Sequence, residues 1–364
     1  MLKICHIISG DLWAGAEVMV FHLLKGLKKY NNLKLSAILL NEGILAEKLR
    51  GLEILVDIFD ENKLSFFKLY KEIKKKINSD PPNIIHSHRY KENILSYLCS
   101  RNIRSVKLIA TQHGLPEPYE GHKKLKNILT KGFNQFILKK YFYKFVVVSK
   151  DIEETLISQY GFLRKKIKVV HNGIEIPENS NLKNENQFVI GSAGRLFSVK
   201  DYPLMVNIAW EVLKHANHIQ FKLAGEGPEY LKIKNLIEEY GLNGNFILEG
   251  FMEDLTPFYH KLDIYLNTSL HEGIPISVLE AMSHGIPVIA PKVGGLKEII
   301  TDGVDGFLIG SRNAKDFAEK CLQLYIDRNL RIRMGQAARG KIIKEFSLEN
   351  MADQYHILYE KVFV

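Results

Sequence analysis

The sequence predicts an α/β protein built from two doubly wound, parallel-sheet (Rossmann-like) domains that face each other across a cleft. Three observations support this fold class: short apolar runs alternate with longer amphipathic ones, the alternation starts again after a break, and a polar segment marks that break near the middle of the chain. Strands that alternate with helices form parallel sheets with helices on both faces. At 364 residues the chain is long enough for two such domains.

Apolar runs in the first half are expected to be buried strands at residues 2–9, 34–40, 83–86, 106–111 and 144–149. Amphipathic stretches such as 15–30 and 64–78 separate them and are expected to be helices. The second half repeats the alternation with expected strands at 188–193, 219–224, 245–248, 262–267 and 287–290. Each half is therefore predicted to hold one parallel sheet with helical crossovers.

A polar, Asn-rich segment at residues 177–187, PENSNLKNENQ, lacks large apolar residues and is typical of a linker. We therefore place the domains at 1–176 and 177–346. The last stretch, 347–364, is expected to be a helix that crosses back onto the first domain. Ligands of doubly wound sheets bind beyond the carboxyl ends of the strands, so the cleft is the expected site.

Composition limits the class of protein. Hydrophobic residues make up 46% and charged residues 25% of the chain, which excludes collagen-like, disulfide-scaffold and disordered proteins. The three widely spaced cysteines, Cys5, Cys99 and Cys321, predict neither a disulfide framework nor a zinc site and favour a reducing compartment. We expect no secretory signal and no membrane-spanning segment, and hence a cytoplasmic protein.

Glycine-containing loops follow the first strand of each half. Gly15 lies in a loop of small residues that leads into a helix, an arrangement that suits an anion but also an ordinary turn. In the second half Gly194-Arg195 is followed by Lys200, and two cations at this spacing can clamp a diphosphate or simply be solvated. Gly225-Glu226-Gly227-Pro228, after the next strand, is by itself most typical of a tight turn.

The stretch 271–285 carries the strongest signal. A helix is expected to start near Ile276, with free amides at its N-terminus that can bind phosphate. Glu272 lies in the loop before this helix and Glu280 within it, so the two carboxylates can address different parts of one ligand. Carboxylate oxygens accept hydrogen bonds from sugar hydroxyls. A capped surface helix with two ordinary acids is the alternative.

Glu272 to Glu280 resembles the Glu-x7-Glu motif of the retaining family 4 glycosyltransferases with the GT-B fold. The rest of the chain is similar to that family in the expected order, with the Gly15 loop, Asn172-Gly173, Gly194-Arg195 with Lys200, Gly225-Glu226-Gly227-Pro228, and Gly294-Gly295 with Glu298. The resemblance covers the chain from end to end.

The resemblance implies roles on the donor side. Arg195 and Lys200 would bind the donor diphosphate, Glu280 the ribose and Glu272 the hydroxyls of the donor sugar. His113 would lie near the transferred sugar and act with Arg195, Lys200 and Glu272 in catalysis. The donor-binding residues so implied are Gly15, Asn172, Gly194, Arg195, Lys200, Gly225, Phe251, Glu272, Gly273, Ile274, Pro275, Ile276, Ser277 and Glu280.

Two departures leave the sugar open. The first loop has Ala14-Gly15 where a double glycine is common, and Gly273-Ile274-Pro275 stands where Gly-Phe-Gly is frequent. His88 and Ala14 are expected on the acceptor side. His86 and His88 are expected on opposite faces of a strand, which argues against a shared metal ion. The family implies no required metal and no cofactor besides the nucleotide-sugar substrate.

All of the excess positive charge lies in the first half. Residues 1–180 hold 30 Lys and Arg against 18 Asp and Glu, whereas residues 181–364 hold 20 against 23. Residues 122–144 contain no acid and are expected to form a basic amphipathic helix, either packed internally or lying on an anionic membrane through Lys123, Lys124, Lys126 and Lys131. A peripheral position on the inner membrane face follows from the second interpretation. No basic-aromatic platform for nucleic acid is evident.

The function expected from the resemblance is a retaining, metal-independent hexosyl transfer from a nucleotide sugar, with UDP favoured, to a glycan or lipid-linked glycan in surface-polysaccharide or glycolipid assembly. The leaving diphosphate would be stabilised by Arg195, Lys200 and helix N-termini. Two alternatives are a nucleotide-sugar epimerase of the same fold and a non-catalytic two-domain sugar binder. Epimer formation from donor alone, or the absence of any turnover, would distinguish them.

Overall fold

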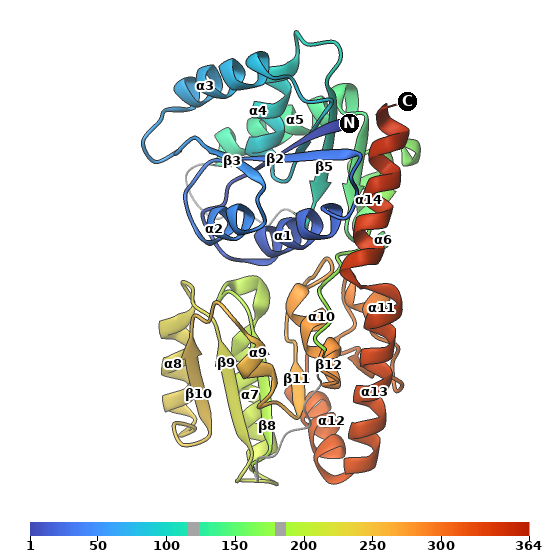
Figure 1. Ribbon diagram of the computed structural model, residues 1–364. Coiled ribbons are helices and arrows are strands. Elements are labelled where there is room, and N and C mark those ends of the chain that lie inside the picture. Colours follow the sequence, from blue (N-terminus) through green and yellow to red (C-terminus); the bar gives the residue numbers. More distant parts are fainter. Residues whose placement is uncertain (116–123, 179–186, 364) are drawn as a thin grey trace. The chain divides into compact units, whose positions relative to one another are not determined.

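The computed structural model describes residues 1–115, 124–178 and 187–363, and the side chains of 124–129 fall outside that description (Figure 1). The chain divides into two compact units. Unit 1 comprises Met1–Gly173 and Leu348–Val364, and unit 2 comprises Ile174–Ser347. The sequence placed the boundary slightly later, between residues 176 and 177.

Unit 1 is built on a seven-stranded parallel sheet with the order β3-β2-β1-β4-β5-β6-β7. Its strands are β1 (Leu2–Ile8), β2 (Leu33–Leu39), β3 (Leu55–Ile58), β4 (Ile84–Ser87), β5 (Lys107–Gln112), β6 (Lys144–Val147) and β7 (Ile167–Val169). The interior strand β1 is buried along almost its whole length, as expected for a strand covered on both faces.

The helices of unit 1 are α1 (Gly15–Leu27), α2 (Ile44–Gly51), α3 (Phe66–Ser79), α4 (Tyr90–Ser100), α5 (Lys124–Tyr141), α6 (Lys150–Ser158), the short η1 (Arg164–Lys166) and α14 (Leu348–Phe363). The last helix, α14, lies beside α1 (Figure 1). A Cβ on Gly26 of α1 would come within 2.7 Å of Leu348 and 2.8 Å of Ala352, so a glycine there permits the close packing.

Unit 2 is built on a six-stranded parallel sheet with the order β10-β9-β8-β11-β12-β13. Its strands are β8 (Val189–Ala193), β9 (Gln220–Ala224), β10 (Phe246–Gly250), β11 (Ile264–Leu266), β12 (Val288–Pro291) and β13 (Gly306–Ile309). Its helices are η2 (Ser198–Lys200), α7 (Tyr202–Leu213), α8 (Tyr230–Glu239), α9 (Thr256–Tyr259), α10 (Ile276–Ser283), α11 (Leu296–Ile299), α12 (Ala314–Ile326) and α13 (Arg328–Glu345). The strand order reverses between β8 and β11, and such a reversal marks the ligand site in doubly wound sheets.

The predicted fold class is confirmed, and every predicted run forms a strand. Three strands were missed, β3, β7 and β13, and each is short. β3 begins with Leu55, which is 56% exposed, so it lacks the continuous apolar signal of a buried strand. β13 begins with Gly306, where a Cβ would lie 2.5 Å from the carbonyl oxygen of Val288 on β12. Of the helices in the described part of the chain, none is long and apolar enough to cross a bilayer.

Candidate active site

Two loops of unit 2 meet where its strand order reverses. The loop after β8 carries Gly194, Arg195 and, at the end of η2, Lys200; the loop after β11 carries Asn267, Ser269 and Glu272. Because parallel neighbours end at the same edge of a sheet, these side chains are delivered to one place. The hydrogen bond from the Thr268 hydroxyl to the Lys200 carbonyl, 2.9 Å long, joins the two loops directly.

The centre of this site is an ion pair. Lys200 Nζ lies 2.6 Å from Glu272 Oε1. The same carboxylate oxygen accepts from the Ser269 hydroxyl at 2.6 Å and from Asn267 Nδ2 at 3.4 Å. Burial alone would raise the pKa of Glu272, but Lys200 and these hydrogen bonds outweigh it and hold the pKa below its usual value. Glu272 is therefore an ionised carboxylate in a buried position.

The loop that carries Glu272 rests on two glycines. The amide of Gly295 donates to the Glu272 carbonyl at 3.0 Å. A Cβ on Gly295 would lie 1.8 Å from the Gly273 carbonyl oxygen, and one on Gly294 would lie 2.1 Å from the Glu272 carbonyl oxygen. Gly294 also has a φ of +49°. The Gly294-Gly295 pair noted in the sequence is therefore needed to seat the backbone of Glu272.

Arg312 supports the same two loops and was not foreseen from the sequence. Its guanidinium donates to the carbonyls of Ser269, at 3.0 Å, and Thr268, at 2.7 Å. It also pairs with Asp201, the residue after Lys200. Arg312 lies far along the chain, after β13, so only the fold brings it here, and no local motif indicates it.

Glu280 lies in α10, as predicted, and is partly buried. Tyr259, at the end of α9, donates a hydrogen bond to Glu280 Oε2 at 2.7 Å. Burial raises the pKa of Glu280 to about 7, although the Tyr259 hydrogen bond opposes the rise. Gly273, Ile274 and Pro275 form the buried turn before α10, and Ile276 and Ser277 begin the helix.

Other predicted residues of unit 2 lie just after β8, β9 and β10. Arg195 is exposed; its guanidinium stacks over the Phe197 ring, 4.6 Å from the ring centroid, and forms no ion pair with any described residue. Gly225 packs on the same loop, because a Cβ there would lie 2.0 Å from the Gly194 carbonyl oxygen. Phe251, just after β10, is 49% exposed.

Gly15 of unit 1 differs from Gly225, Gly294 and Gly295 in how closely other atoms pack against it. Ala14 is the N-cap of α1 and Gly15 its first residue. A Cβ on Gly15 would have no heavy atom of the described chain within 4 Å, so packing does not require glycine there. Nearby, Arg89 Nη2 donates to the buried Glu17 Oε1 at 2.5 Å, which ties the start of α4 to α1. Asn172, in the loop after β7, is buried.

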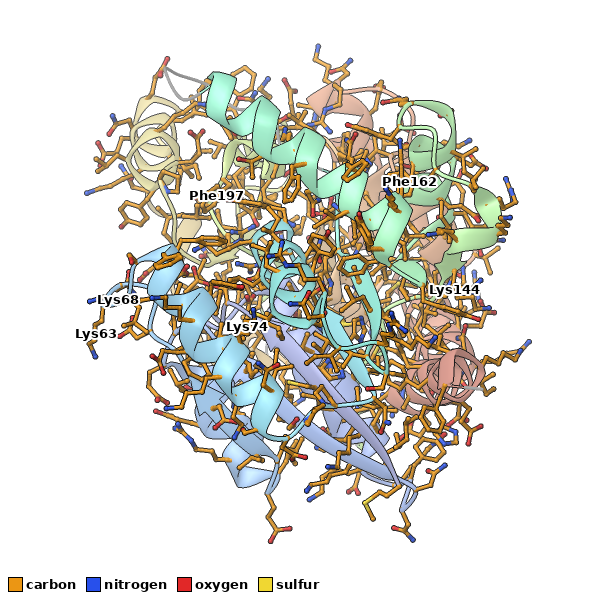
Figure 2. All side chains as sticks on the ribbon, turned by 90° about the horizontal axis from the view of Figure 1, so that it is seen from above. Lys63, Lys68, Lys74, Lys144, Phe162 and Phe197 are labelled. Atoms are coloured by element: carbon orange, nitrogen blue, oxygen red, sulfur yellow. The ribbon has the colours of Figure 1, made fainter. Side chains whose placement is uncertain are left out.

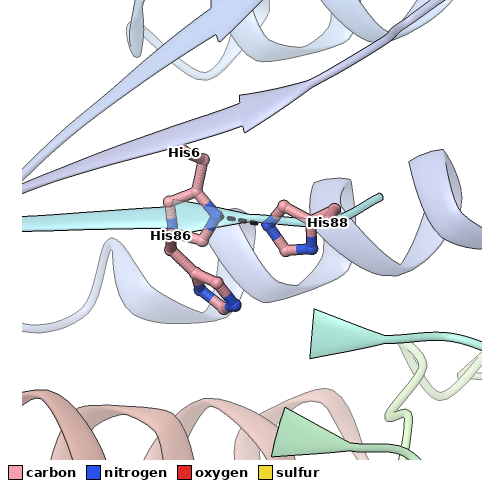
Figure 3. A group of neighbouring side chains, drawn as sticks. All are labelled: His6, His86 and His88. Atoms are coloured by element: carbon pink, nitrogen blue, oxygen red, sulfur yellow. Dashed lines mark hydrogen bonds between the residues drawn. The ribbon is translucent and has the colours of Figure 1, made fainter. Parts of the chain in front are cut away.

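Histidines of unit 1 form a cluster, which corrects one expectation. His86 and His88 were expected on opposite faces of a strand; both are buried, and their ring centroids lie 4.3 Å apart. Residues two apart on a strand share a face, so the expectation was wrong. His6 on β1 joins them (Figure 3), with its Nδ1 3.0 Å from His88 Nε2. His113, after β5, places Nε2 3.2 Å from His88 Nδ1.

Family comparisons agree with this arrangement of loops. Residues 174–341 match the family described as "Glycosyl transferases group 1", and residues 13–177 match the one described as "Glycosyltransferase Family 4". The chain belongs to the group 1, family 4 glycosyltransferases. The two matches meet near residues 174–177, which is where the structure divides into its units.

Curated relatives of this protein are themselves named as glycosyltransferases. It is 26% identical over 311 residues to the Escherichia coli UDP-Gal:alpha-D-GlcNAc-diphosphoundecaprenol alpha-1,3-galactosyltransferase, with 81% of this chain and 78% of that protein covered. It is 29% identical to the Staphylococcus aureus capsular polysaccharide biosynthesis glycosyltransferase CapH, with 82% and 84% covered. Among solved structures, Anabaena HepE in complex with UDP and glucose has a TM-score of 0.86 at 19% identity over 99% of this chain and all of that one. The fold of the glycosyltransferase is thus GT-B.

The basic helix of the glycosyltransferase is α5. Lys123 lies outside the described residues, as do the side chains of Lys124 and Lys126, while Lys131 is partly buried. The apolar side of α5 divides: Ile137 and Leu138 are buried, whereas Phe133 and Phe136 are 41% and 51% exposed. In the adjoining part of unit 1, Lys63 and Lys68 point outward at α3 and the turn before it (Figure 2).

Proposed function

We propose that this glycosyltransferase moves a hexosyl unit from a UDP-sugar to a hydroxyl of a glycan or lipid-linked glycan, with retention at the anomeric carbon, in surface-polysaccharide or glycolipid assembly. The ion pair of Lys200 and Glu272 at the strand-order reversal of unit 2 carries the proposal, and the loop that holds Lys200 also holds the exposed Arg195. The activities for which the relatives are named and the UDP bound to Anabaena HepE support the choice of donor and setting.

Donor binding is assigned to unit 2 in this proposal. Arg195 and Lys200 bind the diphosphate, and Gly194 and Gly225 let the backbone approach it. Glu280 accepts hydrogen bonds from the ribose hydroxyls, and Glu272 from the hydroxyls of the sugar. The turn Gly273–Pro275 and the first amides of α10 hold the remaining oxygens, while Asn172 and Phe251 border the nucleotide.

Unit 1 contributes Gly15, which lets the backbone approach the diphosphate, and His113, which contacts the transferred sugar. That Gly15 has no packing requirement for glycine supports a ligand role, because the free space beside it is open to an incoming group. Ala14 and His88 belong to the acceptor side. His88 acts there through His113, since His88 itself is buried.

The reaction proposed is a displacement on one face of the sugar. The bond between the anomeric carbon and the diphosphate oxygen breaks, and the acceptor oxygen forms its bond on the same face. The acceptor proton passes to an oxygen of the leaving diphosphate. Arg195, Lys200 and helix N-termini stabilise the negative charge that develops there, so we expect no metal to be needed and a chelator to leave the rate unchanged.

A thermal-shift panel of UDP, GDP, ADP and their sugars tests the donor, since ligands that bind the folded state raise its stability. We expect the largest shift with a uridine ligand; equal shifts for all nucleotides would remove the UDP assignment. Proton NMR of the product then reads the anomeric configuration. An inverted product would defeat the retaining mechanism, and epimerisation of donor alone would favour the epimerase.

Unit 1 is also proposed to meet an anionic membrane at α5. The exposed aromatic rings Phe133 and Phe136 lie among lysines, and Lys140 Nζ lies 5.5 Å from the Phe136 ring centroid. Exposed aromatic and cationic side chains on one helix are typical of interfacial binding. A lipid-linked acceptor would be presented at such a surface.

A further inference from the structure

Seven buried or partly buried groups in unit 1 form one unbranched hydrogen-bonded chain. It starts at the Tyr355 hydroxyl, 3.0 Å from Thr111 Oγ1, which in turn lies 2.7 Å from His86 Nε2. His86 Nδ1 is 2.7 Å from the Tyr359 hydroxyl, which is 3.3 Å from His6 Nε2. From there the chain passes from His6 Nδ1 to His88 Nε2 and from His88 Nδ1 to His113 Nε2.

The last atom of this chain is His113 Nδ1. It is buried and has no hydrogen-bond partner among the described residues. Each histidine in between uses both ring nitrogens, and a neutral imidazole has one donor and one acceptor. The Thr111 and Tyr359 hydroxyls could also accept from both neighbours, but their own protons would then be buried without a partner. With every hydroxyl proton used, the chain runs in one of two directions, and the proton position at one end fixes every other.

The Tyr355 end of the chain favours one direction of hydrogen-bond donation. The Tyr355 hydroxyl has a single described partner, Thr111, so it must donate there or leave a buried donor unsatisfied. If Tyr355 donates, Thr111 donates to His86 Nε2, and His86 Nδ1–H donates to Tyr359. Tyr359 then donates to His6 Nε2. The opposite direction leaves both the Tyr355 proton and the His113 Nδ1 lone pair without partners, two unsatisfied groups instead of one.

We propose that this chain fixes His113 as the Nδ1–H tautomer, so that His113 donates a hydrogen bond to an oxygen of the bound sugar. His6 and His88 then also carry their protons on Nδ1, and each donates to the next ring. Tyr355, Thr111, His86, Tyr359, His6 and His88 are thus positioning residues that act through His113. A bound sugar oxygen would satisfy the last unsatisfied donor of the chain.

Burial keeps the chain neutral, so that each imidazole carries a single proton. It lowers the pKa of His6 and of His113 to about 3, and the pKa of His86 and of His88 falls well below its usual value. A metal ion held by His6, His86 and His88, whose ligand atoms lie within 4.8 Å of one another, is the competing interpretation. It is disfavoured because a divalent cation would be buried among neutral ligands that already pair with other groups.

Both tyrosines of the chain come from α14, the C-terminal helix. Which ring nitrogen of His113 carries the proton is therefore set by residues more than 240 positions away in the sequence, as the contact between Thr111 and Tyr355 shows. The proton positions can be tested without substrate. What His113 contacts, in contrast, rests on the proposed function.

Nitrogen-15 NMR of protein labelled at histidine tests the chain directly, because protonated and unprotonated ring nitrogens have different shifts. We expect His6, His86, His88 and His113 all to be neutral with the proton on Nδ1. Nε2–H at His88 or His113 would overturn the proposal. Zinc retained at one equivalent, with shifts of the first three histidines on chelation, would overturn it in favour of a metal centre.

Thr111→Val combined with Tyr355→Phe removes both hydroxyls that precede His86 in the chain while keeping the size of each side chain. With no hydroxyl left to donate to His86 Nε2, the direction of the chain should no longer be fixed, so a population of Nε2–H should appear at His113. The kcat should fall about 10-fold, as for other residues that act through a hydrogen-bonded partner, with little change in donor KM. Tyr325→Phe is the matched control, since Tyr325 makes a 2.6 Å hydrogen bond to His218 in unit 2. Unchanged tautomers in the Thr111→Val, Tyr355→Phe double variant would overturn the proposal. If the tautomers are as expected but the protein has no transferase activity, the tautomer proposal stands and the proposed function is rejected.

Discussion

Lys200 Nζ and Glu272 Oε1 lie 2.6 Å apart, and each comes from a different loop at the strand-order reversal of unit 2. The resemblance to family 4 assigned these residues to separate parts of the donor, diphosphate and sugar. The structure shows them as partners of each other. In the proposed function, the diphosphate and the sugar hydroxyls would therefore lie next to each other, around this ion pair.

Removing Lys200 should destabilise the protein most near neutral pH. The pKa of Glu272 is lowered in the folded protein, so its contribution to stability is present above pH 4.5 and is lost as pH falls through the folded pKa. In Lys200→Ala, burial without a cation raises that pKa instead. Urea unfolding should show a loss of about 3 kcal/mol at pH 7 and a smaller loss near pH 4. A loss of stability that does not change with pH would show that Lys200 does not control the ionisation of Glu272.

Binding of a UDP-sugar should release protons through Glu280. Its pKa of about 7 means that part of the carboxyl population is protonated at pH 6.5. Ribose hydroxyls donate to the ionised form and favour it, so binding lowers the pKa. Calorimetry in two buffers of different ionisation enthalpy measures the released protons. Glu280→Gln should remove the release, and an equal release from that variant would place the titrating group elsewhere.

Gly15→Ala and Gly295→Ala should behave differently. A Cβ at Gly15 meets no described atom, so stability should change by less than about 0.5 kcal/mol while turnover falls because the donor can no longer approach. A Cβ at Gly295 lies 1.8 Å from the Gly273 carbonyl oxygen, so that variant should lose both stability and turnover. Thermal unfolding and initial rates separate the two. Normal turnover in Gly15→Ala would exclude a close ligand at this loop.

Neutralising the basic end of α5 should release the enzyme from anionic vesicles. The wild-type protein should float together with anionic vesicles. The fourfold Lys-to-Gln variant, changed at Lys123, Lys124, Lys126 and Lys131, should not float with them. The control removes four exposed lysines of unit 2 by the same change, Lys232, Lys234, Lys292 and Lys315. Equal flotation of the α5 variant and the wild type would remove the membrane role of this helix.

Most of the sheets could be predicted from the sequence because buried parallel strands are continuous apolar runs. The missed strands lack that signal: β7 is three residues long, and β3 starts with an exposed leucine. Glu272 and Glu280 were identified because both belong to one local stretch, and α10 starts at Ile276 as expected. Signals of this kind depend on residues that are close along the chain.

Contacts between distant segments explain what sequence reasoning missed. Arg312 reaches the Lys200 and Glu272 loops from beyond β13, and its own surroundings in the sequence contain no motif. Tyr359 of α14 contacts both His86 and His6, which come from different strands. His86 and His88, in contrast, could have been placed correctly, because the two-residue period of a strand puts them on one face.

The central claim is that Arg195 and Lys200 hold the donor diphosphate and stabilise it as it leaves. Initial rates of UDP-sugar turnover in Arg195→Ala and Lys200→Ala test it most directly. The matched control is Lys222→Ala, since Lys222 pairs with Glu249 at 2.7 Å within unit 2 but outside the two site loops. Turnover should fall about 10²–10³-fold in both site variants and stay near the wild-type rate in the control. Near-normal turnover in either folded site variant would contradict the account.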